Sequence, residues 1–132
     1  SQRDILMIAT GTGIAPIKSM LLSLLEQAGM RRVRLFFGLR NVSDLFYTKM
    51  LSDLRATHSR FEPTIILSQP DPFGWRGLRG RVTDLIRDQV SPEEASHTDA
   101  YLCGGRSMIE DVKQLLIHKG MSLEHMHHEN FY

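Results

Sequence analysis

A glycine-rich turn near the start of the chain has the residue types of a phosphate-binding loop. Its residues are Thr10, Gly11, Thr12 and Gly13, between an apolar run at residues 5–9 and a helical pattern that has Pro16 near its beginning. Proline is tolerated there because its missing N–H would be unpaired in a first helical turn. Free backbone N–H groups and the positive end of the helix then point at one place, which suits a pyrophosphate. The turn is a weak signal by itself, since Pro16 replaces the third glycine of the dinucleotide fingerprint.

Apolar runs predict the strands that must position this turn. We expect strands at residues 5–9, 33–37, 64–67 and 100–103, and a final strand at residues 124–132. Pro63 lacks an N–H for the ladder, so the third strand is expected to start no earlier than residue 64.

Helical signals lie between these strands. Apolar residues at helical spacing follow the glycine turn, and a short helix is expected at residues 82–89. The expected N-caps are Ser43, Ser91 in a capping box with Glu94, and Ser107 in a capping box with Glu110, and the expected stops are Gly29 and Gly120. Alternating strands and helices predict an α/β fold: a doubly wound parallel sheet of about five strands with helices on both faces.

Three unusual loops follow strand ends, at residues 10–13, 68–80 and 103–107. The carboxyl ends of parallel strands share one edge of the sheet, where ligands bind at the point at which the strand order reverses. The loops are therefore expected to meet at one rim. The long second loop is of a length that is more often functional than not, and its Phe73 and Trp75 are expected to pack as part of a lid.

Composition limits the classes of protein that the chain can belong to. Its 132 residues suffice for one domain, and its net charge of +1 gives no reason to expect nucleic acid as a partner. Cys103 is the only cysteine, which excludes an intramolecular disulfide and favours a cytoplasmic setting. No apolar run approaches the length of a membrane span. His125 and His127 would share one face of a strand, which falls short of a zinc site, so no metal is expected.

Six motifs in order resemble the NAD(P)-binding domain of the ferredoxin–NADP reductase superfamily. The motifs are Gly11-Thr-Gly-Ile-Ala-Pro16, Phe37-Gly-Leu-Arg40 with Asp44-Leu-Phe-Tyr47, Leu67-Ser68, Trp75 leading to Gly80-Arg-Val82, Tyr101-Leu-Cys-Gly104 with Met108, and Glu129-Asn-Phe131. The resemblance covers essentially the whole chain and is greatest to the NADH-dependent reductase components of multicomponent oxygenases. It implies a single NAD(P)-binding domain over residues 1–132, the C-terminal part of a longer flavin-dependent reductase.

The resemblance also implies roles for particular residues. Those implied to bind the pyrophosphate are Thr10, Gly11, Thr12, Gly13 and Pro16; those on the adenosine side are Arg40, Asp44, Tyr47, Ser68 and Gln69; those beside the nicotinamide are Cys103 and Gly104; and those approaching the flavin are Glu129 and Phe131. Met108 is implied to bind the cofactor. Cys103 and Glu129 are the residues implied to lie at the reacting rings. Any role of Cys103 would be in packing and electrostatics, since hydride transfer requires no covalent attack.

Two departures from the family pattern bear on the cofactor. Gly105 and Arg106 follow the Cys-Gly pair where the family commonly has proline, so this loop can differ in shape. Gln69 stands where NADPH-preferring members often have arginine, which favours NADH, since a 2′-phosphate calls for a bidentate basic partner. The nearby arginines at positions 40, 76, 79 and 81 leave NADPH open.

The implied function is to bind NADH and position it for hydride transfer to FAD or FMN. The flavin would be held by another domain of the same chain, and the electrons would pass to a one-electron carrier such as an iron–sulfur domain or a ferredoxin. The isolated domain would then be inactive as a reductase. A non-catalytic nucleotide-binding module that docks a partner stays open as the alternative. A self-contained dehydrogenase is disfavoured, because no substrate domain or proton-relay pair is present.

Overall fold

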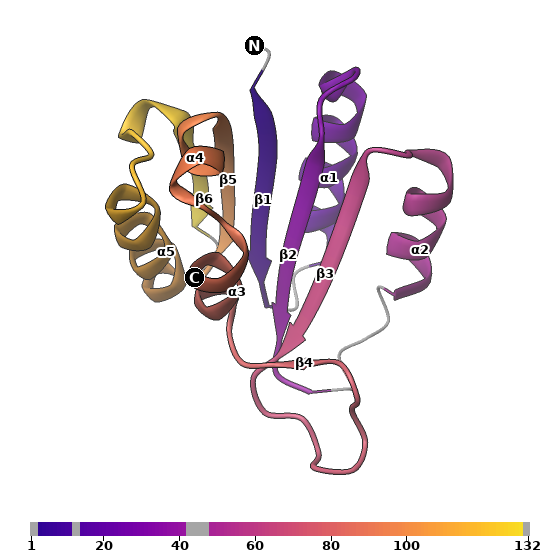
Figure 1. Ribbon diagram of the computed structural model, residues 1–132. Helices are drawn as coiled ribbons and strands as arrows, with labels where there is room; N and C mark the ends of the chain where they lie inside the picture. Colours follow the sequence, from indigo (N-terminus) through magenta and orange to yellow (C-terminus); the bar gives the residue numbers. More distant parts are fainter. Residues whose placement is uncertain (1–2, 12–13, 42–47, 131–132) are drawn as a thin grey trace.

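The computed structural model describes residues 3–11, 14–41 and 48–130, which form a six-stranded parallel sheet in the order β4-β3-β2-β1-β5-β6 (Figure 1). The strands are β1 (Asp4–Thr10), β2 (Val33–Leu39), β3 (Phe61–Leu67), β4 (Leu78–Arg79), β5 (Thr98–Gly104) and β6 (Met126–Asn130). The order reverses between β1 and β5, which confirms the doubly wound prediction. The strand beyond the expected five is β4, a two-residue strand within the long loop.

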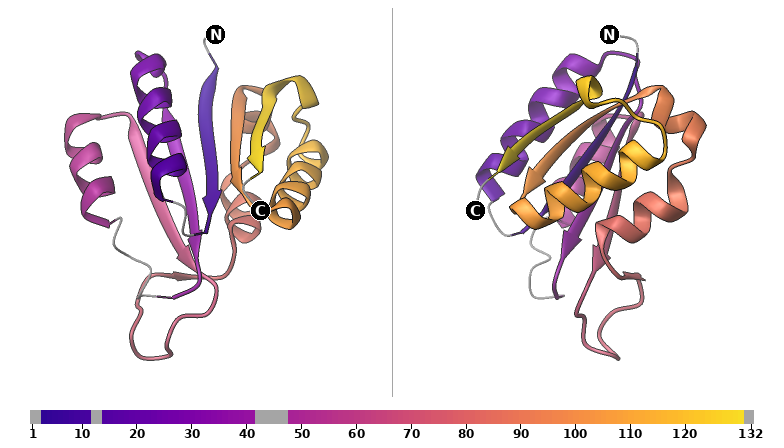
Figure 2. Two further views of the ribbon diagram at one scale, coloured as in Figure 1. Left: turned by 180° about the vertical axis from the view of Figure 1, so that it is seen from behind. Right: turned by 90° about the vertical axis from the view of Figure 1, so that its left-hand side faces the viewer.

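Helices cover both faces of the sheet, as the side view in Figure 2 shows. They are α1 (Ile14–Ala28), α2 (Thr48–Thr57), α3 (Val82–Gln89), α4 (Pro92–Ser96) and α5 (Arg106–His118), with a 3-10 turn at Leu123–His125. One apolar cluster lies under α1 and α2 and the other under α3 and α5. Phe36 and Phe37 enter opposite clusters because successive strand residues face opposite sides. Burial of both faces explains the continuous apolar runs of β1 and β2.

The third strand was expected to start no earlier than residue 64, but it begins at Phe61, so Pro63 is its third residue. Backbone groups of alternate residues in β3 point to opposite neighbours: the Ser68 N–H donates to Leu39 of β2, whereas the Leu67 carbonyl accepts from Gly80. Pro63 has the same parity as Leu67. Its nitrogen therefore faces the side on which β4 pairs only with Ile66 and Leu67, so no ladder bond is lost there.

Two other boundaries differ from the expected ones. Helix α5 begins at Arg106 with Gly105 as its N-cap, so Ser107 lies in the first turn and is not a cap. The final strand begins at Met126, because the 3-10 turn precedes it. His125 is in that turn, where its Nδ1 lies 2.9 Å from Asp99 Oδ1, and it does not share a strand face with His127 as expected. The expected cap at position 43 lies outside the described residues.

Ser91 caps α4 as predicted and forms a reciprocal pair of bonds with Glu94. The Glu94 N–H donates to Ser91 Oγ over 3.0 Å, and the Ser91 N–H donates to Glu94 Oε1 over 3.1 Å. Arg34 Nη1 of β2 donates to the other carboxylate oxygen over 3.0 Å. Burial raises the pKa of Glu94, but the bonds from Ser91 and the charge of Arg34 oppose it, and the pKa lies below its usual value.

The Glu94→Gln variant is expected to unfold with a weaker dependence on acid pH than the wild type. Because the pKa of Glu94 is lower in the folded state, its carboxylate stabilises the fold at pH values above the pKa of the unfolded state. This contribution is lost as the pH falls through the pKa of the folded state. At neutral pH the variant should lose about 1 kcal/mol or less, since partly exposed ion pairs contribute little. Urea unfolding from pH 7 to pH 3 measures this. Glu93→Gln, an exposed neighbour, is the control, and equal pH dependence in all three proteins would contradict the assignment.

Candidate functional site

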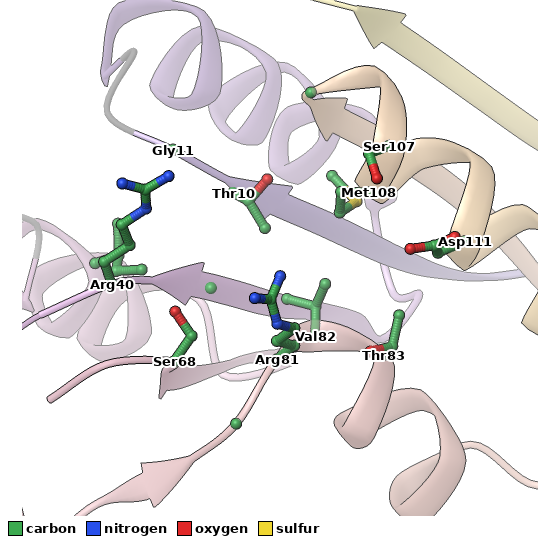
Figure 3. A pocket seen from close by; sticks show the side chains of 14 residues that line it. Thr10, Gly11, Arg40, Ser68, Arg81, Val82, Thr83, Ser107, Met108 and Asp111 are labelled. Carbon is green, nitrogen blue, oxygen red and sulfur yellow. The ribbon is translucent and has the colours of Figure 1, made fainter.

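A cavity of about 630 Å³ lies at the carboxyl ends of the strands, where the predicted loops meet (Figure 3). This volume is typical of a small-molecule site. Its lining residues are Thr10, Gly11, Gly38, Leu39, Arg40, Ser68, Gly80, Arg81, Val82, Thr83, Gly105, Ser107, Met108 and Asp111. Each of the three predicted loops contributes to this lining, and the prediction of a shared rim is confirmed.

The lining combines cations, hydroxyls, apolar groups and one carboxylate. Arg40 follows β2 and Arg81 precedes α3, and the view in Figure 3 shows both guanidinium groups directed toward the cavity. Hydroxyl groups come from Ser68, Thr83 and Ser107. Within the described part of the chain, these three hydroxyls have no hydrogen-bond partner. Polar side chains that face a cavity without protein partners are available to a ligand.

The first turn of α5 adds a favourable place for negative charge. No side chain caps this helix, and its first internal bond runs from the Ile109 N–H to the Gly105 carbonyl. The N–H groups that precede Ile109 are therefore available at the positive end of the helix. Gly105 and Ser107 of this end line the cavity, so an anionic ligand is favoured there.

Gly104 brings the end of β5 close to Thr10 and Met108. Its φ is +153°, and a Cβ at this position would lie 2.6 Å from Thr10 Oγ1 and 2.8 Å from Met108 Cε. A side chain would therefore displace two residues of the cavity wall.

The Gly104→Ala variant is expected to lose about 1–3 kcal/mol of stability, from its backbone conformation and from these contacts. Thermal unfolding measures the loss. Gly120→Ala is the matched control, since Gly120 has φ of +103° and nothing within 4 Å of its Cβ position. If Gly104→Ala loses no more stability than Gly120→Ala, the side chains of Thr10 and Met108 move away from the new methyl group without a loss of stability.

The residues implied by the family resemblance fall into four groups. Those that line the cavity are Thr10, Gly11, Arg40, Ser68 and Met108. Those that are described but do not line it are Pro16, Gln69, Cys103 and Gly104. Only the backbone of Glu129 is described, where it pairs with Cys103. Those outside the described residues are Thr12, Gly13, Asp44, Tyr47 and Phe131.

Cys103 is fully buried in the apolar cluster beneath α1. Its contact with a nicotinamide ring stays a prediction. Gln69 is exposed, and its backbone N–H donates to the Arg40 carbonyl over 2.8 Å, which ties the loop after β3 to the end of β2. The Gly104 backbone lies directly behind Thr10 and Met108, at the edge of the cavity.

Sequence reasoning missed Gly38, Thr83 and Asp111. It placed Ser107 in a loop at the rim, but it assigned the side chain as a helix cap and not as part of a ligand site. Asp111 follows Ser107 by four residues, so both lie on one face of α5. That spacing could have indicated Asp111 once Ser107 was placed at the rim. Gly38 requires tertiary information, since a Cβ there would lie 3.0 Å from Val82 Cγ1, which comes from another segment.

A second, smaller groove of about 490 Å³ lies beside α1 and the last two strands. It is lined by Pro16, Tyr101, His127 and His128 among others, and the rings of Tyr101 and His127 stack at 4.8 Å. Among the described residues, no group of three or more His, Cys, Asp or Glu is placed to hold a metal. Nor does any described helix have the length and apolar character needed to cross a membrane.

The long loop does not pack as expected throughout. Phe73 is 100% exposed, which contradicts its expected role as a packing residue. Trp75 packs against the cluster beneath α1 and α2, and its Nε1–H donates to the Leu78 carbonyl over 2.8 Å. Arg79 Nη2 also donates to the Trp75 carbonyl. The loop is held by these internal bonds, which leave its tip in solvent.

Comparison with known proteins agrees with this geometry. The family model described as oxidoreductase NAD-binding domain matches residues 7–114. The reductase component of phenol 2-monooxygenase from Pseudomonas sp. strain CF600 is 32% identical over 98% of this chain and 36% of its own length. The ferredoxin–NAD(P)(+) reductase component of the naphthalene 1,2-dioxygenase system from Pseudomonas putida is 32% identical over 96% of this chain and 38% of its own length.

Solved structures show the same fold. The Amycolatopsis cytochrome P450 reductase GcoB has a TM-score of 0.84 and 26% identity over 99% of this chain and 38% of its own. Ferredoxin–NADP+ reductase from Plasmodium falciparum has a TM-score of 0.69 and 21% identity over 98% of this chain and 52% of its own, and shows likeness of fold alone. The chain thus spans little more than a third of the curated relatives compared above. With a family model that matches most of its length, it belongs to the oxidoreductase NAD-binding domain family.

Proposed function

We propose that this domain binds NADH and presents its nicotinamide for hydride transfer to a flavin held by another domain. The main observation in support of the proposal is the cavity at the carboxyl ends of the strands, where the strand order reverses between β1 and β5. This cavity is lined both by residues of the glycine turn and by two arginines. Arg40 and Arg81 offer positive charge to a pyrophosphate, and Ser68 offers a hydroxyl to a ribose. The naphthalene 1,2-dioxygenase relative is named as a ferredoxin–NAD(P)(+) reductase component, which supports a ferredoxin as the one-electron acceptor. The flavin partner and the alternative of an iron–sulfur domain follow from the resemblance to the reductase family.

The domain's own contribution is to bind and orient the dinucleotide. Hydride transfer between two rings requires a near-attack distance and no general base, so orientation is the main contribution. When bound, a flavin supplies the change from hydride to single-electron transfer. The nicotinamide would lie toward Gly104 and Cys103 at the end of β5, with the adenosine in the cavity. Glu129 and Phe131, at the end of the last strand, would lie on the flavin side.

NADH is the proposed form of the nucleotide because Gln69, an exposed neutral residue, follows Ser68. A 2′-phosphate at this place would lack a bidentate basic partner on the same segment. Titration of the ¹⁵N-labelled chain with NADH and NADPH tests this. Amide shifts at Gly11, Ser68 and Gly104 with tighter binding of NADH are expected. Absence of shifts at millimolar nucleotide would contradict the proposal.

The position of the flavin has a separate test. The chain by itself should reduce ferricyanide with NADH at a negligible rate, and appreciable turnover without added flavin would contradict a flavin held elsewhere. A chimera with the flavin-binding part of the phenol 2-monooxygenase reductase should reduce its flavin with NADH. If the chimera binds NADH and its flavin stays oxidised, the domain is better described as a non-catalytic nucleotide-binding module.

A further inference from the structure

The guanidinium of Arg81 is directed toward the cavity, although no ion pair holds it there (Figure 3). Among the described residues, no carboxylate forms an ion pair with this group. We infer that Asp84, which does not line the cavity, is a positioning residue that fixes the backbone of Arg81 and thereby directs its charge toward the phosphates of a bound dinucleotide. This inference rests on the proposed nucleotide-binding function.

Two reciprocal hydrogen bonds join Asp84 to the backbone of Arg81. The Arg81 N–H donates to Asp84 Oδ2 over 2.8 Å, and the Asp84 N–H donates to the Arg81 carbonyl over 2.9 Å. Arg81 is the N-cap of α3, with extended backbone angles of φ −120° and ψ 166°. Donors at the beginning of a helix have no partner within it, so the carboxylate supplies one. These bonds fix the residue at which the loop turns into the helix, and with it the direction in which the Arg81 side chain leaves the backbone.

The second carboxylate oxygen of Asp84 is bonded on the helix itself. Asp84 Oδ1 accepts from Arg87 Nη1 over 3.1 Å, and Arg87 follows Asp84 by three residues on α3. The two oxygens are therefore divided between Arg87 and the Arg81 backbone, which holds the carboxylate in one orientation. Because Asp84 bonds the backbone N–H of Arg81 and not its guanidinium, that guanidinium stays available to a ligand.

Gly80 leaves the space in which the carboxylate reaches the Arg81 N–H. Its φ is +134°, and a Cβ at this position would lie 2.6 Å from Asp84 Oδ2 and 3.4 Å from Ile66 Cδ1. The Gly80 N–H donates to the Leu67 carbonyl over 2.8 Å. The short segment that carries Arg81 is thus bonded to the end of β3 on one side and to the first turn of α3 on the other.

The charge of Asp84 by itself would oppose the binding of an anion. Its side chain is 49% exposed, and a carboxylate near a site for phosphates repels them. If Asp84 affected the ligand only through its charge, its removal would tighten the binding of NADH. A positioning role predicts weaker binding, because a displaced Arg81 loses its charge-assisted bond to a phosphate oxygen. The two effects differ in sign, so a measured affinity separates them.

The 132-residue Asp84→Ala variant should bind NADH about three- to tenfold more weakly than the wild type, since part of the contribution of Arg81 is lost. Asp84→Asn should bind NADH nearly as tightly as the wild type, because the amide oxygen can accept from the Arg81 N–H. In a chain that already carries Arg81→Ala, the Asp84→Ala change should alter the affinity by about twofold or less, because no guanidinium is left to position. Isothermal titration calorimetry measures these affinities.

Glu94→Ala is the matched control. Like Asp84, Glu94 accepts a bond from the N–H of the N-cap of its helix, here Ser91 over 3.1 Å, but neither residue lines the cavity. This variant should lose thermal stability, because a capping bond is removed, and it should keep the wild-type affinity for NADH. Circular dichroism confirms that each variant is folded.

The outcomes separate the role of Asp84 from the proposed function. If the wild type binds NADH and Asp84→Ala binds it equally or more tightly, the positioning role is wrong and the nucleotide-binding function stands. The same holds if Asp84→Ala loses as much affinity without the Arg81 side chain as with it, or if Glu94→Ala loses as much as Asp84→Ala. If the wild type does not bind NADH, the proposed function is wrong and the inference about Asp84 is wrong with it.

Discussion

Simultaneous replacement of Arg40 and Arg81 by alanine is expected to weaken NADH binding about 100-fold. Both side chains line the cavity from different segments, one at the end of β2 and one before α3. Hydrogen bonds to charged groups contribute about 1.5–3 kcal/mol each, so the loss of each should cost about tenfold or more in affinity. The fold should be retained, because both residues are exposed and the bond from the Arg81 backbone N–H to Asp84 remains possible.

The control for this pair is the double variant Lys49→Ala with Arg60→Ala. It removes the same charge from exposed positions outside the cavity lining. Its affinity for NADH, measured by isothermal titration calorimetry, should stay close to that of the wild type. Wild-type binding should also weaken with added salt, and the arginine variant should lose part of this dependence. Equal losses in both double variants would mean that only net charge matters.

Phe36→Ala is expected to lower the free energy of unfolding by about 3–5 kcal/mol. Phe36 is 1% exposed in the cluster under α3 and α5, and the guanidinium carbon of Arg34 lies 5.0 Å from the centre of its ring. Removal of a buried aromatic ring forfeits its transfer free energy and leaves a cavity. Since domains of this kind are stable by about 5–15 kcal/mol, the loss is a large part of the total.

Phe73→Ala is the matched control for this substitution, because the same atoms are removed from a fully exposed side chain. It should change stability by about 0.5 kcal/mol or less. Urea unfolding of the three proteins measures both values. A loss in Phe73→Ala comparable to that in Phe36→Ala would show that the tip of the long loop is packed in solution.

Local patterns were sufficient for most of the secondary structure. The short helix at residues 82–89 matches α3, and α1 ends at Ala28, directly before Gly29, which has φ of +60°. Ser91 and Glu94 form the expected capping box. These features depend on residues within one or two turns of each other, so periodicity and capping chemistry can be recognised in the sequence.

Ser107 and Pro63 show where local patterns misled. Ser107 with Glu110 has the spacing of a capping box, but Gly105 begins the helix and leaves the hydroxyl of Ser107 to the cavity. The unpaired side of β3 accepts Pro63 within the strand, because β4 pairs with only its last two residues. Whether a residue has a ladder partner depends on the order of strands in space.

The sequence was enough to predict a doubly wound α/β domain with three loops at one rim, since strand direction and loop position follow from alternating local patterns. The glycine turn could be recognised in this way, whereas Arg40, Ser68 and Met108 were named only from the resemblance to the reductase family. Only the tertiary structure brought Asp111 of α5 to the same cavity as Arg81, thirty residues earlier in the chain. Such convergence results from how α3 and α5 pack on one face of the sheet, which is a long-range property that local spacing does not encode.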